Sequence, residues 1–236
     1  MSTQFPQTAP NSAKELFVRM RAVISHGWYE IPSDRRFKGT GGSGCLLEAL
    51  LGSRAGKCDI ADSTGWEVKT YTDKTNLITL FHKEAHPVNI MRHMVRKWGW
   101  KDKLGRMSFR HTIAGRSDRF KVESDGTQVT VRPLKANGPV PYWTYDDLYN
   151  AASKLRRVLL VKAEKDGQRV KFVDAVRYEN FQVKDFVYQM TKGTVCVDFD
   201  AREASPGSGG LRNHGTKFRV SPLNIGRLYH NKQPLG

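Results

Sequence analysis

Three side chains in one short segment have the types and spacing for metal-assisted chemistry. Asp62 precedes Glu67 by 67 − 62 = 5 positions, and Lys69 follows on the next alternate residue. Carboxylates hold Mg²⁺, a hard cation that prefers oxygen ligands. A bound metal polarises a phosphate and lowers the pKa of bound water, while a lysine can orient that water or stabilise developing charge. The segment therefore suits phosphodiester hydrolysis, with Asp59 as a competitor of Asp62 for the first acidic position.

A strand over residues 66–71 would position two of these side chains. Side chains alternate along a strand, so Glu67 and Lys69 would share one face. Charges on a largely buried strand are costly unless they have a partner or a function. The alternative is a plain salt bridge on the surface of an edge strand. The pattern alone leaves both interpretations open, because Glu-x-Lys is common.

A short helix over residues 44–51 brings a further carboxylate close to that strand. Gly44, Glu48 and Gly52 are spaced four apart and fall in one row. Glycines beside a carboxylate allow another element to approach closely. We expect Glu48 to face the strand that follows; an ordinary solvated glutamate at the rim of the apolar stripe is the alternative.

The overall charge points to a polyanionic partner. Lys and Arg number 39 and Asp and Glu 23, giving a net charge of +16 in 236 residues. Such an excess favours nucleic acid, with counterion release as the driving force, although a basic surface without that role is the alternative. Three distant cysteines predict neither a disulfide framework nor a zinc site. Residues 1–11 lack a signal-peptide pattern and no apolar run approaches about 20 residues, so we expect a cytoplasmic protein without a membrane span.

The elements alternate between helix and strand, which predicts a mixed α/β fold. Residues 66–71 and 77–82 are expected to pair as a hairpin, and Asp125-Gly126 and Asp166-Gly167 mark two further hairpin turns. The expected helices cover 13–24, 44–51, 91–98, 144–156, 183–189 and a last one from Ser221-Pro222, and the other strands cover 120–122, 129–131, 158–163, 170–178 and 194–199.

In this order, the motifs resemble a known group of nucleases. Residues 44–52, followed by Asp62 and Glu67-Val68-Lys69, are similar to the MutH-like branch of the PD-(D/E)XK nucleases. The closer resemblance is to the BcnI/MvaI type II restriction endonucleases. It extends through Asn76-Leu77-Ile78-Thr79-Leu80-Phe81-His82-Lys83 and a C-terminal stretch over residues 215–231. Residues 41–83 and 158–231 carry the similarity, whereas the N-terminus and the middle match poorly.

The resemblance implies a fold, an activity and a catalytic set. The fold would be a restriction-endonuclease-like mixed β-sheet flanked by helices, in a two-lobed clamp around DNA. A mainly catalytic lobe over residues 1–125 and a mainly DNA-recognition lobe over 126–236 are expected, with an approximate boundary and lobes that can be discontinuous. The activity would be Mg²⁺-dependent cleavage of duplex DNA at a short GC-rich site, one strand at a time. The implied roles are metal ligands at Asp62, Glu67 and Val68, a catalytic lysine at Lys69 and a supporting carboxylate at Glu48.

Candidate DNA-binding residues lie in several basic or glycine-rich segments. His82 corresponds to a histidine that approaches the middle of the target in the resembling group. The loop over residues 209–219 differs from its relatives at Asn213-His214 and at Lys217, so we name no target site. Arginine and lysine can bind guanine O6 and N7, but most protein–DNA hydrogen bonds go to phosphate, which is the alternative for each residue. The full set is His82, Lys83, Arg212, Asn213, His214, Lys217, Arg219, Arg35, Arg36, Lys38, Arg92 and Arg96.

Two other functions compete with a restriction endonuclease. A MutH-like repair nickase would depend on a mismatch-repair partner and on methylation state. A DNA-binding protein with an inactive centre would bind without cutting, although the intact acidic residues and Lys69 argue against it. A restriction enzyme implies a bacterial or archaeal host with a cognate DNA methyltransferase, and the resemblance implies that a monomer acts.

Overall fold

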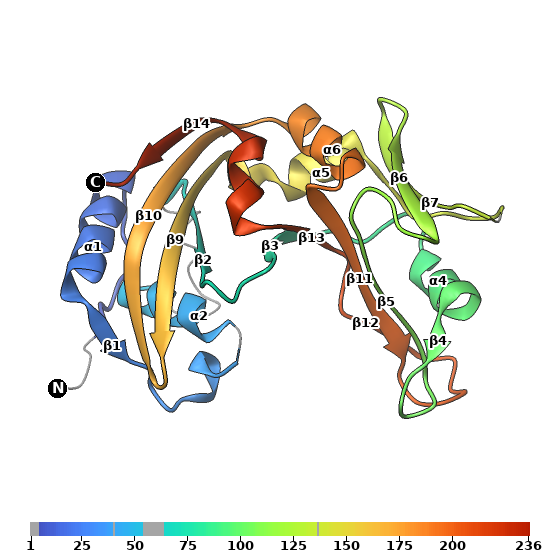
Figure 1. Ribbon diagram of the computed structural model, residues 1–236, viewed down its shortest axis with the longest axis horizontal. Helices are drawn as coiled ribbons and strands as arrows, with labels where there is room; N and C mark the ends of the chain where they lie inside the picture. The colour runs from blue at the N-terminus through green and yellow to red at the C-terminus, as the bar shows by residue number, and fades with distance from the viewer. Residues whose placement is uncertain (1–4, 40, 54–63, 136) are drawn as a thin grey trace. The chain divides into compact units, whose positions relative to one another are not determined.

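The structure, a computed structural model, describes residues 5–39, 41–53, 64–135 and 137–236. The chain forms two compact units, both discontinuous in sequence (Figure 1). The first unit comprises residues 1–78, 154–181 and 229–236, and the second comprises residues 79–153 and 182–228. These bounds differ from the division at residue 125 because β9 (Arg157–Asp166), β10 (Arg169–Phe181) and β14 (Tyr229–Pro234) return from the second half of the chain to the sheet of the first unit. The assignment of roles to the two lobes stays a prediction.

The first unit is built on one sheet in the order β1-β10-β9-β2, with β14 also paired to β10. Its long centre is the antiparallel β9–β10 pair, whereas β2 pairs parallel to β9. The elements of this unit are α1 (Ala13–His26), β1 (Trp28–Glu30), η1 (Arg35–Phe37), α2 (Gly42–Leu50), β2 (Glu67–Tyr71), η2 (Ser153–Arg156), β9 (Arg157–Asp166), β10 (Arg169–Phe181) and β14 (Tyr229–Pro234).

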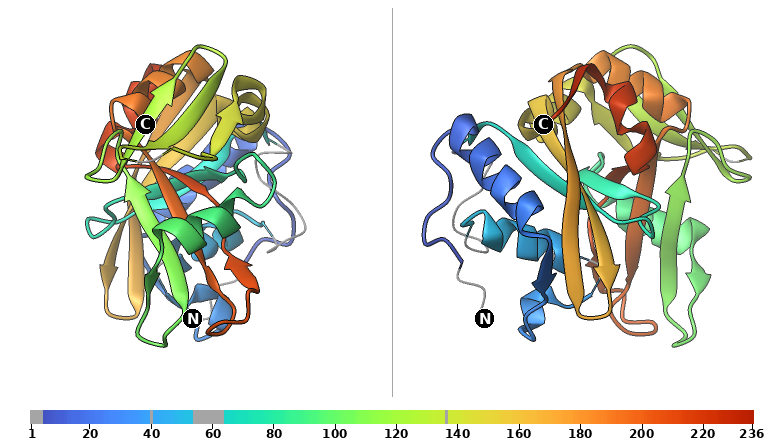
Figure 2. Two further views of the ribbon diagram at one scale, coloured as in Figure 1. Left: turned by 90° about the vertical axis from the view of Figure 1, so that its right-hand side faces the viewer. Right: turned by 60° about the vertical axis from the view of Figure 1, so that its left-hand side comes forward.

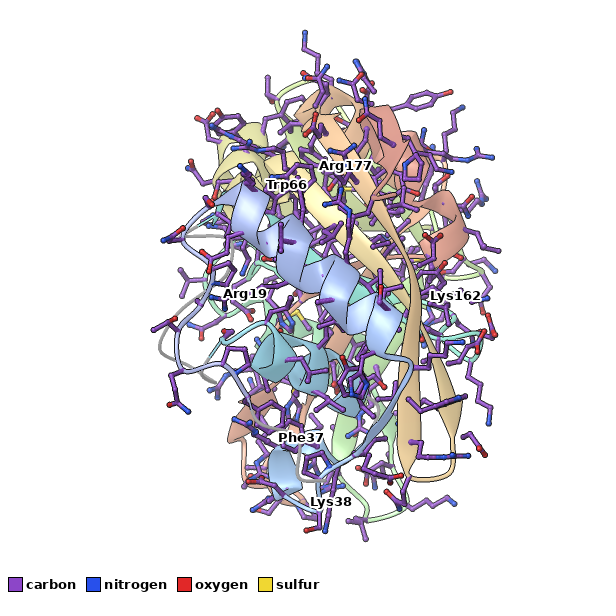
Figure 3. All side chains as sticks on the ribbon, turned by 90° about the vertical axis from the view of Figure 1, so that its left-hand side faces the viewer. Arg19, Phe37, Lys38, Trp66, Lys162 and Arg177 are labelled. Atoms are coloured by element: carbon purple, nitrogen blue, oxygen red, sulfur yellow. The ribbon has the colours of Figure 1, made fainter. Side chains whose placement is uncertain are left out.

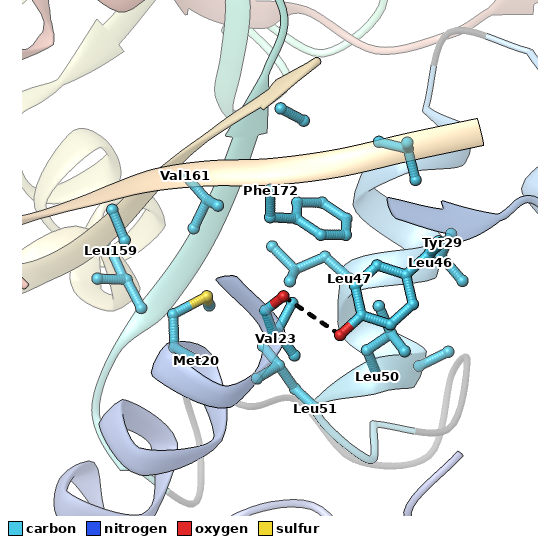
Figure 4. Close-up of a cluster of buried hydrophobic side chains, with 14 of the residues drawn as sticks. Met20, Val23, Tyr29, Leu46, Leu47, Leu50, Leu51, Leu159, Val161 and Phe172 are labelled. Atoms are coloured by element: carbon cyan, nitrogen blue, oxygen red, sulfur yellow. Dashed lines mark hydrogen bonds between the residues drawn. The ribbon is translucent and has the colours of Figure 1, made fainter. Parts of the chain in front are cut away.

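Helices α1 and α2 cover one face of this sheet (Figure 2, right). Leu16 and Met20 of α1 and Leu47 of α2 pack with Leu159 and Phe172 from the strands (Figure 4). The phenol of Tyr29 is buried in the same cluster and donates to the carbonyl of Val23 at 3.2 Å. Because Leu159 lies beside Val68 in the register, Val68 also points to this apolar face and Glu67 and Lys69 point to the opposite one.

Local sequence signals explain where the helices begin. Ser12 caps α1 by accepting from the backbone N–H of Glu15 at 3.2 Å. Thr144 and Asp147 form a capping box at α5 (Tyr145–Ala151), in which the carboxylate of Asp147 accepts from both the backbone and the hydroxyl of Thr144. The helix expected over 144–156 ends early, at Ala151, and a 3-10 turn follows it.

The second unit contains two sheets. The larger runs β3-β13-β11-β5-β4 with β12 also paired to β11, and the smaller runs β6-β7-β8. The elements are β3 (Ile78–His82), α4 (Ile90–Trp98), β4 (Trp100–Lys101), β5 (Met107–Ile113), β6 (Phe120–Ser124), β7 (Gln128–Pro133), β8 (Tyr142–Thr144), α5 (Tyr145–Ala151), α6 (Val183–Thr191), β11 (Val195–Glu203), β12 (Leu211–Asn213), β13 (Lys217–Val220) and η3 (Pro222–Leu228).

An aromatic core holds the second unit together. Phe109 lies 5.5 Å from Phe199 and 5.7 Å from Phe120 between ring centroids, and Phe218 stacks on Phe81 at 4.8 Å. Helices α4 and α6 pack on β11 (Figure 2, left). Rings of this size contribute large apolar areas to the core. The alternate residues of the larger sheet are then free to carry polar groups on its other face.

One predicted pairing is wrong. Residues 67–71 and 78–82 both form strands, but β2 pairs with β9 and β3 pairs with β13 in the other unit. The polar turn between them resembles a hairpin connection, yet long-range pairing with β9 decides the partner of β2. The hairpins at Gly126 and Gly167 are confirmed, with φ of 93° and 55° at the two glycines. The last helix, after Ser221, is a 3-10 helix. None of the helices in the described ranges is long and apolar enough to cross a membrane.

Candidate functional site

Glu67 and Lys69 form a close ion pair on β2. Their side chains lie on the same face, with Lys69 Nζ 2.6 Å from Glu67 Oε1. Strand β2 stands at the end of the sheet path, as the surface interpretation required, but the Glu67 residue is only 7% exposed. A carboxylate this buried costs free energy unless a cation compensates it. The pair is therefore partly desolvated.

A buried tyrosine lies within the electrostatic field of Glu67. Burial raises the pKa of the Tyr229 phenol, and the negative charge of Glu67 raises it further. The Tyr229 hydroxyl donates to the carbonyl of Leu155 at 2.9 Å. The phenol proton of Tyr229 is thus held in a hydrogen bond to the backbone, and the Tyr229 side chain stays neutral beside the Glu67–Lys69 pair. Because it is neutral, Tyr229 adds no charge that would compete with the interaction between Glu67 and Lys69.

The other members of the predicted catalytic set have different outcomes. Asp62 and its competitor Asp59 lie outside the described residues. Glu48 is on α2, as expected, and is exposed. An alanine-type Cβ at Gly44 would meet no atom within 4 Å, whereas Gly52, at φ 89°, lies against the carbonyl of Thr8. The close approach expected beside Glu48 therefore occurs at one glycine and not at the other.

The donors on β2 are of the kind that Mg²⁺ prefers. Glu67 offers carboxylate oxygens, and Val68, whose side chain faces the apolar core, could contribute only its backbone oxygen. Within the ranges that the structure describes, no group of three or more His, Cys, Asp or Glu side chains could hold a metal.

In the second unit, the polar face of β11 arranges cations around two acids. Asp198 Oδ2 lies 3.2 Å from Arg219 Nη1, and Asp200 Oδ2 lies 3.1 Å from Lys217 Nζ. Arg110 of β5 adds a third cation, with its Nε 3.3 Å from Asp200 Oδ1. The predicted residues Lys217 and Arg219 thus lie side by side on β13, each held by its own carboxylate. Fixed cations on one sheet face can present hydrogen-bond donors to DNA at defined spacing.

The loop between β12 and β13 meets the end of β3. A Cβ at Gly215 would lie 3.2 Å from Nδ1 of His82 and 3.3 Å from Oε1 of Glu84, so glycine permits this approach. Asn213 donates to Glu84 at 2.7 Å, and its side-chain oxygen accepts from the backbone of Gly215 at 3.0 Å. The exposed His214 donates its backbone N–H to the backbone carbonyl of Asp200 at 2.9 Å. The structure therefore brings together the predicted His82, Asn213 and His214.

The remaining candidates are distributed over both units. Lys83 is held by Asp147, with Nζ 2.9 Å from Oδ1, and Arg92 on α4 donates to the carbonyl of Gly209 at 2.8 Å. Arg96 and Arg212 are exposed on α4 and β12. In the first unit, Arg35 and Arg36 belong to η1, and the Arg36 guanidinium lies 4.3 Å from the Phe37 ring centroid.

Lys38 borders a cavity in the first unit. This cavity, of about 570 Å³, is lined also by Phe37, Lys165 and Gly167 at the turn between β9 and β10. Figure 3 labels Phe37 and Lys38 on this part of the unit. Two lysines at one cavity suit a phosphate group, which agrees with the predicted role of Lys38 without testing it.

Comparison with known proteins decides the family. Residues 18–229 match the model of the MvaI/BcnI restriction endonuclease family. This chain belongs to the MvaI/BcnI restriction endonuclease family. Family membership confirms the predicted class: the protein is a type II restriction endonuclease, a site-specific deoxyribonuclease that acts on DNA.

Solved structures agree in fold. The structure of the complex of restriction endonuclease MvaI with its cognate DNA substrate matches with a TM-score of 0.78 and 22% identity, over 94% of this chain and 98% of that one. MvaI in the absence of DNA matches with a TM-score of 0.58 and 20% identity, over the full length of both chains. No curated protein matches the sequence. The predicted mixed α/β restriction-endonuclease fold is confirmed.

Sequence reasoning missed several residues of the polar face in this endonuclease. Arg110, Asp198, Asp200 and Arg202 were not singled out, because the expected strand ended at Phe199 and β5 was not expected at all. The alternation of charged and apolar residues from Asp198 to Arg202 was the available signal. It would have extended the strand and placed these side chains on one face.

Proposed function

We propose that this endonuclease hydrolyses phosphodiester bonds of duplex DNA at a short, GC-rich site in a Mg²⁺-dependent reaction. The proposal includes action as a monomer that cuts one strand at a time, in the cytoplasm of a bacterial or archaeal host whose DNA a cognate methyltransferase protects. The observation that supports it most directly is the partly buried Glu67–Lys69 pair on β2, in a chain of this family.

The proposed chemistry uses few groups. Glu67, the backbone oxygen of Val68 and Asp62 would hold the metal, which supplies Lewis acidity toward the phosphate and a more acidic bound water. Lys69 would orient the attacking water or stabilise the added negative charge. Water adds to phosphorus, the bond from phosphorus to the leaving oxygen breaks, and that oxygen takes up a proton. Glu48 would act as a supporting carboxylate.

The proposed DNA contacts follow from charge and position. Arg219 and Lys217 on β13, with Arg212, Asn213 and His214 before them, would read or grip the target together with His82. Contacts to the sugar–phosphate backbone of the DNA would come from six basic residues at scattered positions in the sequence: Lys83, Arg92, Arg96, Arg35, Arg36 and Lys38. Cations that neutralise phosphates release counterions and supply much of the affinity.

Digestion of phage DNA in the presence of Mg²⁺ tests the proposal. We expect a discrete ladder of fragments, and sequencing the fragment ends gives the site and the cut position. Lys69→Ala should abolish the ladder, whereas Lys14→Ala, an exposed lysine of α1 on the opposite side of the sheet, should leave it unchanged. Nicks that require a mismatch-repair partner would favour a MutH-like nickase instead. Tight binding without cleavage across several divalent metals would indicate an inactive centre.

A further inference from the structure

The polar face of β11 carries a third charged position that differs from the other two. Asp198, Asp200 and Arg202 alternate along the strand and share that face, as their ladder partners show. The two acids are occupied by Arg219, Lys217 and Arg110. Arg202 follows them in the same row and has a different set of neighbours.

The residues directly opposite Arg202 on the two adjacent strands carry no negative charge. In the register, Arg202 is opposite Arg212 of β12 on one side and Ser108 of β5 on the other. Its Nε and Nη1 are buried, and neither has a hydrogen-bond partner among the residues that the structure describes. Like charges directly opposite each other on a sheet are unfavourable. Arg202 and Arg212 therefore form a local concentration of positive charge.

The carboxylate that approaches this position is already committed. Asp102 accepts from the hydroxyl of Ser108 at 3.2 Å, but it also accepts from Arg106 Nε at 3.0 Å and Nη2 at 2.8 Å. The backbone N–H groups of Leu104 and Arg106 donate to its other oxygen. With its lone pairs engaged in this way, Asp102 does not neutralise Arg202.

Arg202 is partly exposed, yet its buried Nε and Nη1 have no acceptor among the described residues, and this costs free energy that folding alone does not require. The cost is offset if an external anion or acceptor binds during function. We propose that Arg202 is a DNA-contacting residue, which donates from its planar guanidinium to a phosphate oxygen or to O6 and N7 of a guanine. This inference rests on the proposed cleavage of DNA at a specific site, and it adds a binding residue to the same face as Arg219.

Binding measurements with uncut DNA test the role of Arg202. All proteins carry Lys69→Ala, so that the duplex stays intact, and the probe contains the site obtained by sequencing the digest ends. Arg202→Met should weaken binding to this duplex at least tenfold, while its thermal midpoint stays equal to that of the parent or rises. Arg132→Met, which removes an exposed arginine of β7, should change the affinity less than twofold.

The identity of the acceptor can be read from the same assay. A phosphate contact predicts an equal loss for a scrambled duplex and a salt slope reduced by about 0.9. A guanine contact predicts a loss confined to the specific duplex, with discrimination relaxed at one base pair. Arg202→Lys keeps the positive charge but loses the planar guanidinium with its paired N–H donors. It should therefore bind like the parent if the acceptor is a phosphate, but not if the acceptor is a guanine.

Three results would overturn the inference. Unchanged affinity of Arg202→Met for the specific duplex would do so, as would a large fall in its thermal midpoint, which would indicate a structural arginine. If Arg202→Met does not fold, Arg202→Gln takes its place, because it also removes the charge: affinity equal to the parent for both duplexes then rejects the contact. Failure of the proposed function is distinct, because then the protein with an intact Lys69 gives no ladder.

Discussion

At the scale of single residues, the Glu67–Lys69 pair affects both the stability of the fold and the proposed activity. The two side chains differ in exposure, at 10% for Glu67 and 20% for Lys69. Removing Lys69 therefore leaves a more buried unpaired charge than removing Glu67 does. The position on β2 that would let Lys69 assist at a phosphate in the proposed reaction also makes Lys69 the counter-ion of Glu67.

A double-mutant cycle on this pair should show coupling. Lys69→Met is expected to lower the free energy of unfolding by about 2 kcal/mol in EDTA, because Glu67 remains without its partner. Glu67→Gln should cost less, since Lys69 can reach water more easily. The double variant should cost less than the sum of the two, and urea unfolding measures all three. Strictly additive losses would show that the 2.6 Å pair contributes no net stability.

Prediction of these residues from sequence succeeded where the pattern was local. Alternation along one strand was enough to put Glu67 and Lys69 on a common face, and no other element had to be known. Arg202 is the opposite case, because its character depends on Arg212 and Ser108, which reach it through long-range strand pairing. In a basic sequence, an arginine whose N–H groups lack hydrogen-bond acceptors cannot be told from any other arginine.

At the scale of elements, the start of α5 concentrates several interactions on Asp147. Its carboxylate caps the helix and also binds Lys83 at 2.9 Å and His86 at 3.1 Å. Burial alone would raise the pKa of Asp147, but hydrogen bonds from Lys83 and Thr144 outweigh it and lower the pKa from 3.8 to about 2. Asp147 therefore links β8, α5 and the segment after β3.

This lowered pKa gives a signed pH dependence. A depressed carboxylate contributes stability that is complete above its unfolded pKa and is lost as the pH falls toward its folded pKa. Asp147→Asn should therefore lower the free energy of unfolding by about 1–2 kcal/mol at pH 7. The deficit should shrink as the pH falls from 3.8 to about 2. Urea titrations at several pH values measure it, with the exposed neighbour Asp146→Asn as the control. A deficit independent of pH would contradict the assignment.

Strand β11 positions the candidate reading groups through its two acids. Asp198 fixes Arg219 and also accepts from the hydroxyl of Thr112 at 2.7 Å. Asp198→Asn removes a negative charge, so simple electrostatics predicts tighter binding to any DNA. If the acid orients Arg219, the ratio of specific to non-specific affinity should instead fall about tenfold, the order expected for one good base contact.

The matched control for this experiment is Asp118→Asn. It makes the same charge change at an exposed position before β6. Affinities for the specific and a scrambled duplex, in the Lys69→Ala background, measure the ratio. An equal gain in affinity for both duplexes in both variants would show that Asp198 acts only through its negative charge and does not orient Arg219.

Elements were predictable where their connections are short. The long β9–β10 hairpin followed from Asp166-Gly167, and the β6–β7 hairpin from Asp125-Gly126. The error at β2 and β3 arose because a plausible turn was taken as proof of pairing, whereas parallel pairing to β9 joins segments about 90 residues apart in the chain (158 − 67 = 91). Strands β13 and β14 were not expected either, because residues 217–219 were assigned to the loop over 209–219 and residues 229–234 followed the start of a helix expected from Ser221.

At the scale of the whole molecule, two discontinuous units share one strongly basic chain. The family assignment covers residues 18–229 and therefore both units. A net charge of +16 favours association with any duplex, whereas the proposed specificity would depend on a few fixed groups on β11 and β13. Affinity and specificity should thus respond differently to salt.

The salt dependence of binding gives a measure of the phosphate contacts. In the Lys69→Ala background, the logarithm of the association constant should fall linearly with the logarithm of salt concentration, by about 0.9 per contacted phosphate. If Arg92 and Arg96 of α4 each bind one phosphate, replacing both by alanine should reduce this slope by about 1.8 on specific and scrambled duplexes alike. Replacing the exposed Lys14 and Arg132 removes the same charge from α1 and β7 and should leave the slope nearly unchanged. Equal slopes for the two double variants would mean that α4 acts only through net charge, and the backbone contacts would then have to come from the other basic segments.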